Sequence, residues 1–250
     1  MLKSILAITM LFAAFLPAKG RNITDSLNYK VRFGYNIGGT SPLPMPATIR
    51  KLNKYTLQPN YSLGFDVQRN IKGRWGAQVG LLLENKGMKT DAKVMNYRMS
   101  IVRGGESLKG YFTGNNVTKV ELWMLTLPVV ATYSVGKNVN LKFGPYFSYI
   151  TSHTFEGYVY NGYLRENTPT GAKINIGSTK DTRGTFDFSE NMRRIQFGID
   201  AGADWRFNKR WGVSGDITWG LTGIHKSNFH TIEQTLYPIY GTIGITYKLK

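Results

Sequence analysis

Residues 195–207 read Ile-Gln-Phe-Gly-Ile-Asp-Ala-Gly-Ala-Asp-Trp-Arg-Phe, and apolar side chains alternate strictly with small or polar ones. A two-residue period of this kind predicts a β-strand with one apolar face. Asn208-Lys209-Arg210 follows, and Trp211 then begins a second run of the same kind. A three-residue turn places Phe207 opposite Trp211, so the two runs are expected to form a hairpin with a shared apolar face.

The same alternation occurs in eight runs, which predicts an all-β protein. The runs cover residues 29–37, 61–67, 75–83, 123–133, 139–149, 195–207, 211–221 and 237–249. Most have about 9–13 residues, the length that a tilted strand needs to cross a bilayer. Strands of globular proteins are shorter, about 5–6 residues on average. Pro128 and Pro145 lie inside two of the runs and predict local bulges there, because proline lacks the N–H that the ladder needs.

The connections between the runs alternate in length. Three are short, at residues 70–74, 136–138 and 208–210, and four are long, at residues 41–56, 90–116, 157–192 and 225–236. Short turns on one side and long loops on the other are typical of outer-membrane barrels. We therefore predict an eight-stranded antiparallel up-and-down transmembrane β-barrel with short periplasmic turns and long extracellular loops.

Alternation alone leaves open a soluble lipid-binding barrel, in which the apolar face would point inward. Glycine favours the membrane barrel, because glycine weakens a solvent-facing strand but fits a narrow barrel interior. The polar face carries Gly34, Gly38, Gly64, Gly76, Gly80, Gly144, Gly198, Gly202, Gly212, Gly220 and Gly244. Aromatic residues near the short turns resemble the interfacial girdle of a membrane barrel. They are Trp75, Tyr133, Trp205, Phe207, Trp211 and Tyr247.

The N-terminus predicts export. Met1-Leu2-Lys3 is a short basic start, residues 4–16 are apolar, and Ala18-Lys19-Gly20 places small residues before a cut at Arg21. These are the parts of a signal peptide. We expect residues 1–20 to be a signal peptide and residues 21–250 to be the barrel domain in the outer membrane; a buried N-terminal helix is the alternative.

Composition excludes several classes of protein. The chain has no cysteine, so it holds no disulfide, thiolate metal site, cysteine nucleophile or lipoprotein anchor. After the N-terminus no apolar stretch approaches the roughly 18 residues of a membrane-spanning helix. Lysine and arginine number 32 against 15 acidic residues, for a formal net charge of +17. Without Lys3 and Lys19 the mature chain has 30 basic and 15 acidic residues, a charge of +15.

Several segments together resemble the PorT-like outer-membrane β-barrel family. They are Gly80-Leu-Leu-Leu-Glu-Asn-Lys-Gly-Met-Lys89, Leu127-Pro128, Leu141-Lys-Phe-Gly-Pro-Tyr146, Phe197-Gly-Ile-Asp-Ala-Gly-Ala203 and Gly220-Leu-Thr-Gly-Ile224. The resemblance extends from the first run to the eighth and covers little of the long loops. It implies an eight-stranded outer-membrane barrel of Gram-negative bacteria. The member that gives the family its name is linked to protein secretion, and most relatives have no assigned activity.

Ionisable residues on the polar face are expected to point into the lumen. They are Arg32, Asp66, Glu84, Lys142, Arg194, Asp200, Asp204, Arg206, Asp216 and Lys248. Their mixed signs favour a lumen filled by ion pairs, since buried charges require partners. An ion path or acid–base pairs are the alternative. Eight strands enclose little space, so an open pore is not expected.

The histidines offer an enzymatic alternative. His153, His225 and His230 lie at the long-loop ends of the runs, with Ser152, Ser227 and Asp216 as candidate partners. A histidine base could activate a hydroxyl or a water there. The chain has neither a Gly-x-Ser-x-Gly motif nor a metal-spaced histidine pair. We therefore predict a non-enzymatic protein without catalytic, cofactor-binding or metal-binding residues, with a lipid- or peptide-cleaving enzyme at the extracellular rim as the alternative.

The long loops are basic. They carry Arg50, Lys51, Lys54, Lys89, Lys93, Arg98, Arg103, Lys109 and Lys119, against Asp91 and Glu106. Lysine and arginine bind phosphate, so lipopolysaccharide in the outer-membrane lipid is an expected partner. An envelope or secretion protein is a second candidate partner, nucleic acid is not expected, and the barrel is expected to be monomeric. We predict a structural or interaction module whose surface loops make the contacts.

Overall fold

The computed structural model describes residues 27–229, 231–232 and 234–249. The predicted signal peptide, residues 1–20, lies outside the described residues, and so does His230. Among these described residues, strands make up nearly all of the regular structure, with one turn of 3-10 helix, η2 (Ser189–Asn191). Within the described part of the chain, no helix has the length and apolarity to cross a membrane.

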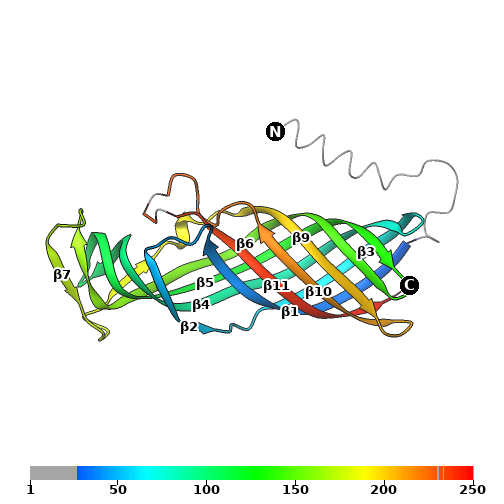
Figure 1. The fold of residues 1–250 in the computed structure, drawn as a ribbon, viewed down its shortest axis with the longest axis horizontal. Helices are drawn as coiled ribbons and strands as arrows, with labels where there is room; N and C mark the ends of the chain where they lie inside the picture. Colours follow the sequence, from blue (N-terminus) through cyan, green and yellow to red (C-terminus); the bar gives the residue numbers. More distant parts are fainter. Residues whose placement is uncertain (1–26, 230, 233, 250) are drawn as a thin grey trace.

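The strands belong to one antiparallel sheet of eleven strands (Figure 1). Their bounds are β1 (Leu27–Pro42), β2 (Ile49–Thr56), β3 (Tyr61–Lys72), β4 (Trp75–Arg103), β5 (Glu106–Val135), β6 (Val139–Glu166), β7 (Lys173–Ile176), β8 (Gly184–Asp187), β9 (Ile195–Arg206), β10 (Trp211–Gly220) and β11 (Leu236–Lys248).

The sheet closes on itself. The pairings run β1–β3–β4–β5–β6–β9–β10–β11, and β11 pairs back with β1 from Lys30 opposite Lys248 to Pro42 opposite Leu236. Closure leaves these strands without a free edge along the paired region. We call this closed part the barrel, and its end with the short connections and both ends of the described chain the short-turn end (Figure 1).

The short turns set the registers that the sequence predicted. Val135 lies opposite Val139 and Tyr133 opposite Leu141. At the next short turn, the N–H of Phe207 donates to the carbonyl oxygen of Trp211 at 3.2 Å. The sequence prediction of bulges at Pro128 and Pro145 is wrong. Pro128 lies opposite Tyr146, and the register of β5 on β6 is unchanged on either side of it, so the ladder loses a hydrogen bond without gaining a residue.

The apolar face of the barrel points outward and the polar face inward, as glycine usage predicted. Outward side chains such as Ile243 (70% exposed), Ile217 (63%) and Phe143 (62%) contrast with inward ones such as Asp66 (1%) and Gln78 (1%). Aromatic pairs surround the short-turn end: Trp75 with Tyr133, Trp205 with Phe207, and Trp211 with Tyr247. This arrangement is the reverse of a soluble barrel with an apolar interior for lipid.

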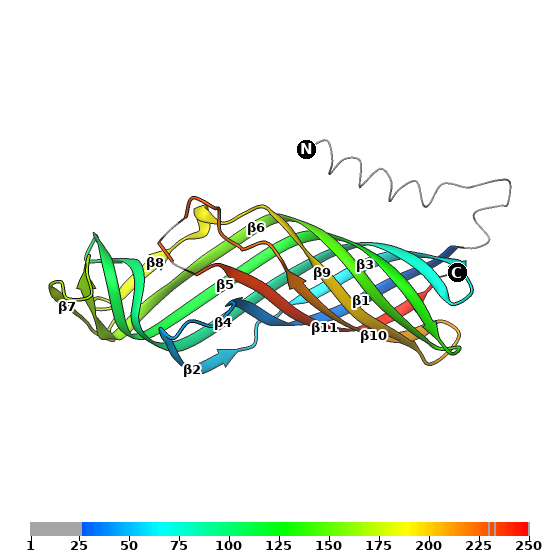
Figure 2. The same ribbon diagram turned by 45° about the horizontal axis from the view of Figure 1, so that its top comes forward.

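At the opposite end, three strands continue far past the barrel where the sequence predicted loops. β4, β5 and β6 have 29, 30 and 28 residues, and they project as a long twisted ribbon (Figures 1 and 2). β4 and β5 meet at Gly104 and Gly105, whose φ angles of 58° and 87° suit glycine. The predicted loop 41–56 contains β2, and the predicted loop 157–192 contains the end of β6, β7, β8 and η2. We call this part the extension.

An apolar core of its own stabilises the extension. Val120 and Leu122 of β5 and Val159 and Leu164 of β6 are fully buried there. The remaining members of the core include Met88, Val94, Tyr97, Met99, Ile101, Phe112, Phe155, Phe186, Phe188, Met192 and Ile224. Burial of such side chains contributes about 1.5–3 kcal/mol each, so this core stabilises the strand pairing of the extension.

Ile199 and Asp200 test which face of the barrel contacts lipid. Asp200 is buried inside the barrel, and its neighbour Ile199 is on the outward face of β9. In a bilayer, Ile199→Arg is expected to lower the free energy of unfolding by about 2–4 kcal/mol, because lipid cannot solvate the guanidinium. Ile199→Leu keeps the apolar volume and is expected to cost less than about 1.5 kcal/mol. Denaturant unfolding in reconstituted bilayers, followed by tryptophan fluorescence, measures both. Equal stabilities would contradict the lipid-facing assignment.

Candidate functional site

The barrel interior is held together by ion pairs between strands. Nζ of Lys142 lies 2.7 Å from Oδ1 of Asp204 and 2.7 Å from Oδ1 of Asp216. Arg32 contacts Asp66 at 3.3 Å and Asp216 at 3.4 Å, and Lys30 contacts Asp204 at 2.6 Å. These side chains are at most about a tenth exposed. Pairing offsets the desolvation of each charge, as a closed low-dielectric interior requires.

The inward glycines make room for these charged side chains. A Cβ built on Gly80 would clash with Oδ1 of Asp66, and one built on Gly202 would clash with Oδ1 of Asp216. The glycines therefore stand where a large polar side chain from a neighbouring strand crosses the lumen. Side chains fill the middle of the barrel, and the cavity lined by Arg32, Glu84 and Tyr146 measures about 20 Å³, room for about one water.

Toward the extension the interior changes from charged to apolar. Lys86 contacts Glu84 at 3.0 Å, and its ammonium lies over the rings of Tyr146 and Tyr240 at 5.6 and 5.7 Å. Beyond this layer, Leu122, Met124 and Ile150 are fully buried and belong to the same core as the extension. Barrel and extension therefore share one continuous interior.

Most residues expected in the lumen lie there. Arg32, Asp66, Glu84, Lys142, Asp200, Asp204 and Asp216 are buried. The expectation is wrong for Arg194, which precedes β9 and is exposed. Arg206 is exposed and Lys248 is half-buried, but both line the polar cavity at the open end of the barrel rather than its buried middle. Alternation assigns a side chain to a face but not to a depth along the barrel axis. Lys30 and Lys86 are lumen residues that the prediction omitted, although Lys30 has the inward parity of the run 29–37 and Lys86 continues that of the run 75–83 three residues past its end.

The structure separates the residues of the enzymatic alternative. Asp216 is paired with Lys142 and Arg32 inside the barrel, whereas His153 and His225 belong to the extension. Among the described residues, no hydrogen bond joins either imidazole to a serine or a carboxylate. No group of three histidine, aspartate or glutamate side chains in the described ranges could hold a metal ion.

His225 instead packs in an aromatic cluster. Its ring stacks on Phe229 at 4.6 Å and meets the edge of Phe155 at 4.8 Å. Nε2 is buried without a hydrogen-bond partner. Burial disfavours the imidazolium and lowers the pKa of His225 from 6.5 to about 4. The neutral ring acts as part of the apolar covering of the extension.

The outward surface of the extension carries lysines that face each other across strands. Lys51 of β2 lies opposite Lys93 of β4, and Lys89 of β4 lies opposite Lys119 of β5. With Lys54, these residues form what we call the lysine face. Nζ of Lys119 contacts Glu121 at 2.9 Å and Glu156 at 3.7 Å. Lys51, Lys54, Lys89 and Lys93 are exposed and have no ion pair among the described residues.

The lysine face lies just above the apolar band of the barrel. Trp123 of β5 is 48% exposed, and Lys119 lies four residues before it on the same face of the strand. Four residues of a tilted strand correspond to about 10 Å along the barrel axis. Like charges directly opposite each other destabilise a sheet. Glu121 and Glu156 offset this repulsion at Lys119, and Lys54 lies opposite Asp91, whereas Lys51 and Lys93 have no ion pair among the described residues.

A closed antiparallel sheet with an apolar outside and a charged, filled inside is the architecture of an outer-membrane β-barrel. The sequence profile described as "Outer membrane protein beta-barrel domain" matches residues 19–226. The chain belongs to this family, and the family indicates the outer membrane as its location.

Solved structures similar to the chain include Ail of Yersinia pestis, determined alone and in complex with the heparin analogue sucrose octasulfate. It is 10% identical, covers 90% of this chain and 99% of its own, and has a TM-score of 0.38. OprG of Pseudomonas aeruginosa is 12% identical, with 90% and 96% coverage and a TM-score of 0.31. The NalP translocator domain of Neisseria meningitidis is 12% identical, with 98% and 95% coverage and a TM-score of 0.25. No curated protein matches the chain significantly.

Asp216 tests the contribution of the buried ion pairs. Asp216→Ala leaves Lys142 and Arg32 each short of a carboxylate and is expected to lower the free energy of unfolding by about 3–5 kcal/mol. Glu121→Ala is the control, because it removes a carboxylate from the exposed pair with Lys119 and is expected to cost about 1 kcal/mol or less. The denaturant midpoint of the folded, faster-migrating form on detergent gels measures both. Similar midpoints for the two variants would show that the lumen pairs contribute no more than surface pairs.

His225 makes the covering of the extension sensitive to acid. An unfolded segment would take up a proton near pH 6.5, whereas the folded one resists protonation down to about pH 4. Stability of this segment is therefore expected to fall as the pH decreases through that window. Hydrogen exchange at residues 222–229, corrected for intrinsic rates, should reveal increased opening. His225→Phe preserves the ring packing and should flatten the pH dependence; an unchanged slope in that variant would exclude His225 as the cause.

Proposed function

We propose that this protein is a non-enzymatic outer-membrane barrel whose eight closed strands cross the bilayer. The short-turn end faces the periplasm, and the extension rises from the outer surface. The extension is a rigid interaction platform, and its lysine face binds the phosphate groups of lipopolysaccharide around the barrel. No cofactor is required for this role.

The position of the lysine face carries the proposal. Lys51, Lys89 and Lys93 are exposed and unpaired among the described residues. Lys89, opposite Lys119, is about 10 Å beyond the end of the apolar band marked by Trp123, and Lys93 with its partner Lys51, four residues farther along the strands, is about 20 Å beyond it. When the apolar outer surface occupies the hydrocarbon core, Lys89 is at the level of the headgroups, and Lys51 and Lys93 lie on their outer side. Ammonium groups bind phosphate as point charges.

The energetics of the sheet support an anionic partner. Lys51 and Lys93 repel each other across the strands, and Lys89 and Lys119 do so to an extent that Glu121 and Glu156 beside Lys119 reduce. Phosphates between them would convert this repulsion into attraction, worth about 1 kcal/mol per lysine near an anionic membrane surface. Strand pairing on both sides of Lys89 holds it in place, so little conformational entropy is lost on binding.

We also propose that the protein is related to the PorT-like proteins. With that relationship we propose a partner that takes part in protein secretion or is another envelope protein. The rigid extension offers such a partner a surface beyond the lipopolysaccharide. The barrel acts as a monomer, with its outward strands in contact with lipid, and nucleic acid has no part in this compartment.

The triple variant Lys51→Gln/Lys89→Gln/Lys93→Gln tests the lysine face. Its affinity for lipopolysaccharide is expected to fall about 100-fold, at about 1 kcal/mol for each of three charges. Titration of lipopolysaccharide into the protein in phosphatidylcholine nanodiscs measures the affinity.

The matched control removes three lysines farther out on the extension, with Lys109→Gln/Lys173→Gln/Lys180→Gln. The control should bind lipopolysaccharide as the parent does. An equal loss in both variants would reduce the effect to net charge, and an unchanged affinity in the first variant would refute the proposed contact.

A further inference from the structure

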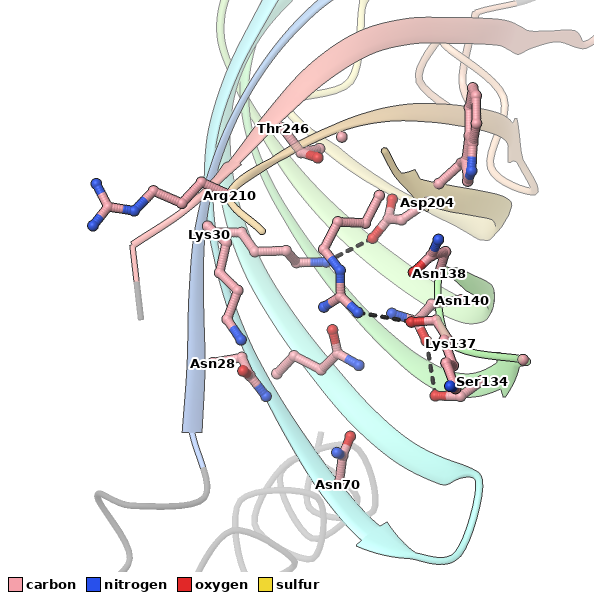
Figure 3. A pocket seen from close by; sticks show the side chains of 16 residues that line it. Asn28, Lys30, Asn70, Ser134, Lys137, Asn138, Asn140, Asp204, Arg210 and Thr246 are labelled. Atoms are coloured by element: carbon pink, nitrogen blue, oxygen red, sulfur yellow. Dashed lines mark hydrogen bonds and ion pairs between the residues drawn. The ribbon is translucent and has the colours of Figure 1, made fainter. Parts of the chain in front are cut away.

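The short-turn end of the barrel opens into a polar cavity of about 300 Å³ (Figure 3). Five cationic residues line it: Lys30, Lys137, Arg206, Arg210 and Lys248. Asp204 is the one carboxylate among the described lining residues. Arg210 points away from the cavity and donates to the hydroxyl of Tyr247 at 3.1 Å, so four cations and one carboxylate leave the lining with an excess of three positive charges.

Asp204 does not neutralise that excess. Its oxygens already accept from Nζ of Lys30 at 2.6 Å and from Nζ of Lys142 at 2.7 Å. Figure 3 shows Lys30 reaching across the cavity toward Asp204, whereas Arg210 points away from it. The carboxylate belongs to the ion-pair network of the lumen, and the cations nearer the opening are left without one.

Arg206 and Lys248 differ in this way from the cations deeper in the barrel. A terminal N–H of Arg206 donates to the carbonyl oxygen of Lys137 at 2.7 Å, a neutral acceptor that uses only part of the guanidinium. Lys248 is half-buried and has no ion pair within the described ranges. Arg32 and Lys142, in contrast, contact two carboxylates each.

Neutral donors complete the lining. The amides of Asn28, Asn70, Asn138 and Asn140 lie around the opening (Figure 3). Ser134 donates to Oδ1 of Asn140 at 2.8 Å, which holds the amide in place. The guanidinium of Arg206 and these amides can together bind an oxyanion, because a guanidinium and an amide NH₂ both donate hydrogen bonds to oxygen.

We infer that this cavity, which we call the vestibule, is a binding site for a small ligand with two or more oxyanion groups, either carboxylates or phosphates. Its volume is at the lower end of the range for ligand sites, about 300 Å³. Concave walls with charges of one sign concentrate counter-ions and raise their local potential. The site is independent of the lysine face, and the proposed orientation of the barrel places it on the periplasmic side.

Calorimetric titration of the refolded chain in uncharged detergent tests the vestibule with two probes, pyrophosphate and citrate. At least one probe is expected to bind with a dissociation constant below about 1 mM. Arg206→Gln/Lys248→Gln is expected to weaken binding about tenfold or more, through loss of two charge-assisted contacts. Lys72→Gln/Arg74→Gln is the matched control, because it removes two exposed charges at the same end of the barrel that do not line the cavity.

The preferred probe distinguishes a phosphate ligand from a carboxylate ligand. Binding of neither probe would overturn the inference, and so would an equal loss in the control. If the first variant does not reach the folded, faster-migrating form on a gel, amide NMR shifts of the parent decide. Shifts induced by the bound probe at Asn140 and Thr246 support the vestibule, and shifts confined to the lysine face refute it.

Discussion

Lys142, Asp204 and Asp216 lie on three different strands of the barrel, and the ammonium contacts both carboxylates at 2.7 Å. The barrel depends on this kind of neutralisation, because strand alternation sends every second side chain of a closed sheet into one narrow interior. Charges placed there lose their hydration and must recover the loss from partners on neighbouring strands. Glycines such as Gly80 and Gly202 supply the space for those partners. The apolar outside and the charged inside are thus two consequences of the same closure.

The extension depends on the barrel for its direction and on its own core for its rigidity. β4, β5 and β6 pass from one into the other without interruption, while their inward residues change from Lys142 and Glu84 to Leu122 and Val159. A flexible loop would spread its lysines over many positions. Paired strands instead hold Lys89 and Lys93 each at a defined height above the apolar band, so the lysines of this face have fixed positions relative to one another.

The two basic regions of the protein differ in construction. The lysine face lies on the outside of a sheet, where each ammonium is exposed and interacts with a partner as a separate point charge. The vestibule is concave and combines a guanidinium with amides around one opening, so it can recognise the shape of a ligand as well as its charge. They lie at opposite ends of the barrel, so the proposed lipopolysaccharide contact and the proposed ligand of the vestibule would not compete for space.

Part of this architecture could be predicted from the sequence, because it depends only on the two-residue alternation within a run and on the length of the turn that follows. Alternation in 195–207 places Asp200 and Ile199 on opposite faces whatever surrounds them, and a three-residue turn sets the register of Phe207 and Trp211. The strands of the extension could not be predicted from the sequence, because bulges interrupt the alternation of apolar and polar residues there. β2 and β4 shift register against their partners, and Asn96 and Asn161 adopt positive φ angles of 54° and 47°. Before the bulge in β4 the inward residues have even numbers, and after it inward residues such as Tyr97 and Met99 have odd numbers. The two parts therefore do not show one continuous alternation in the sequence.

The sequence by itself therefore determined the strand class, the face of each side chain in an uninterrupted run, and the registers across short turns. Only the tertiary structure decided which charges meet, since Lys30 and Asp204 are far apart in the chain and their contact needs the whole barrel to close. It also decided how deep each residue lies, which separates the paired Arg32 from Arg206 at the opening. The physical reason is that alternation along a strand determines the face on which each side chain lies. Ion pairing and cavity shape depend instead on the distances between side chains of different strands.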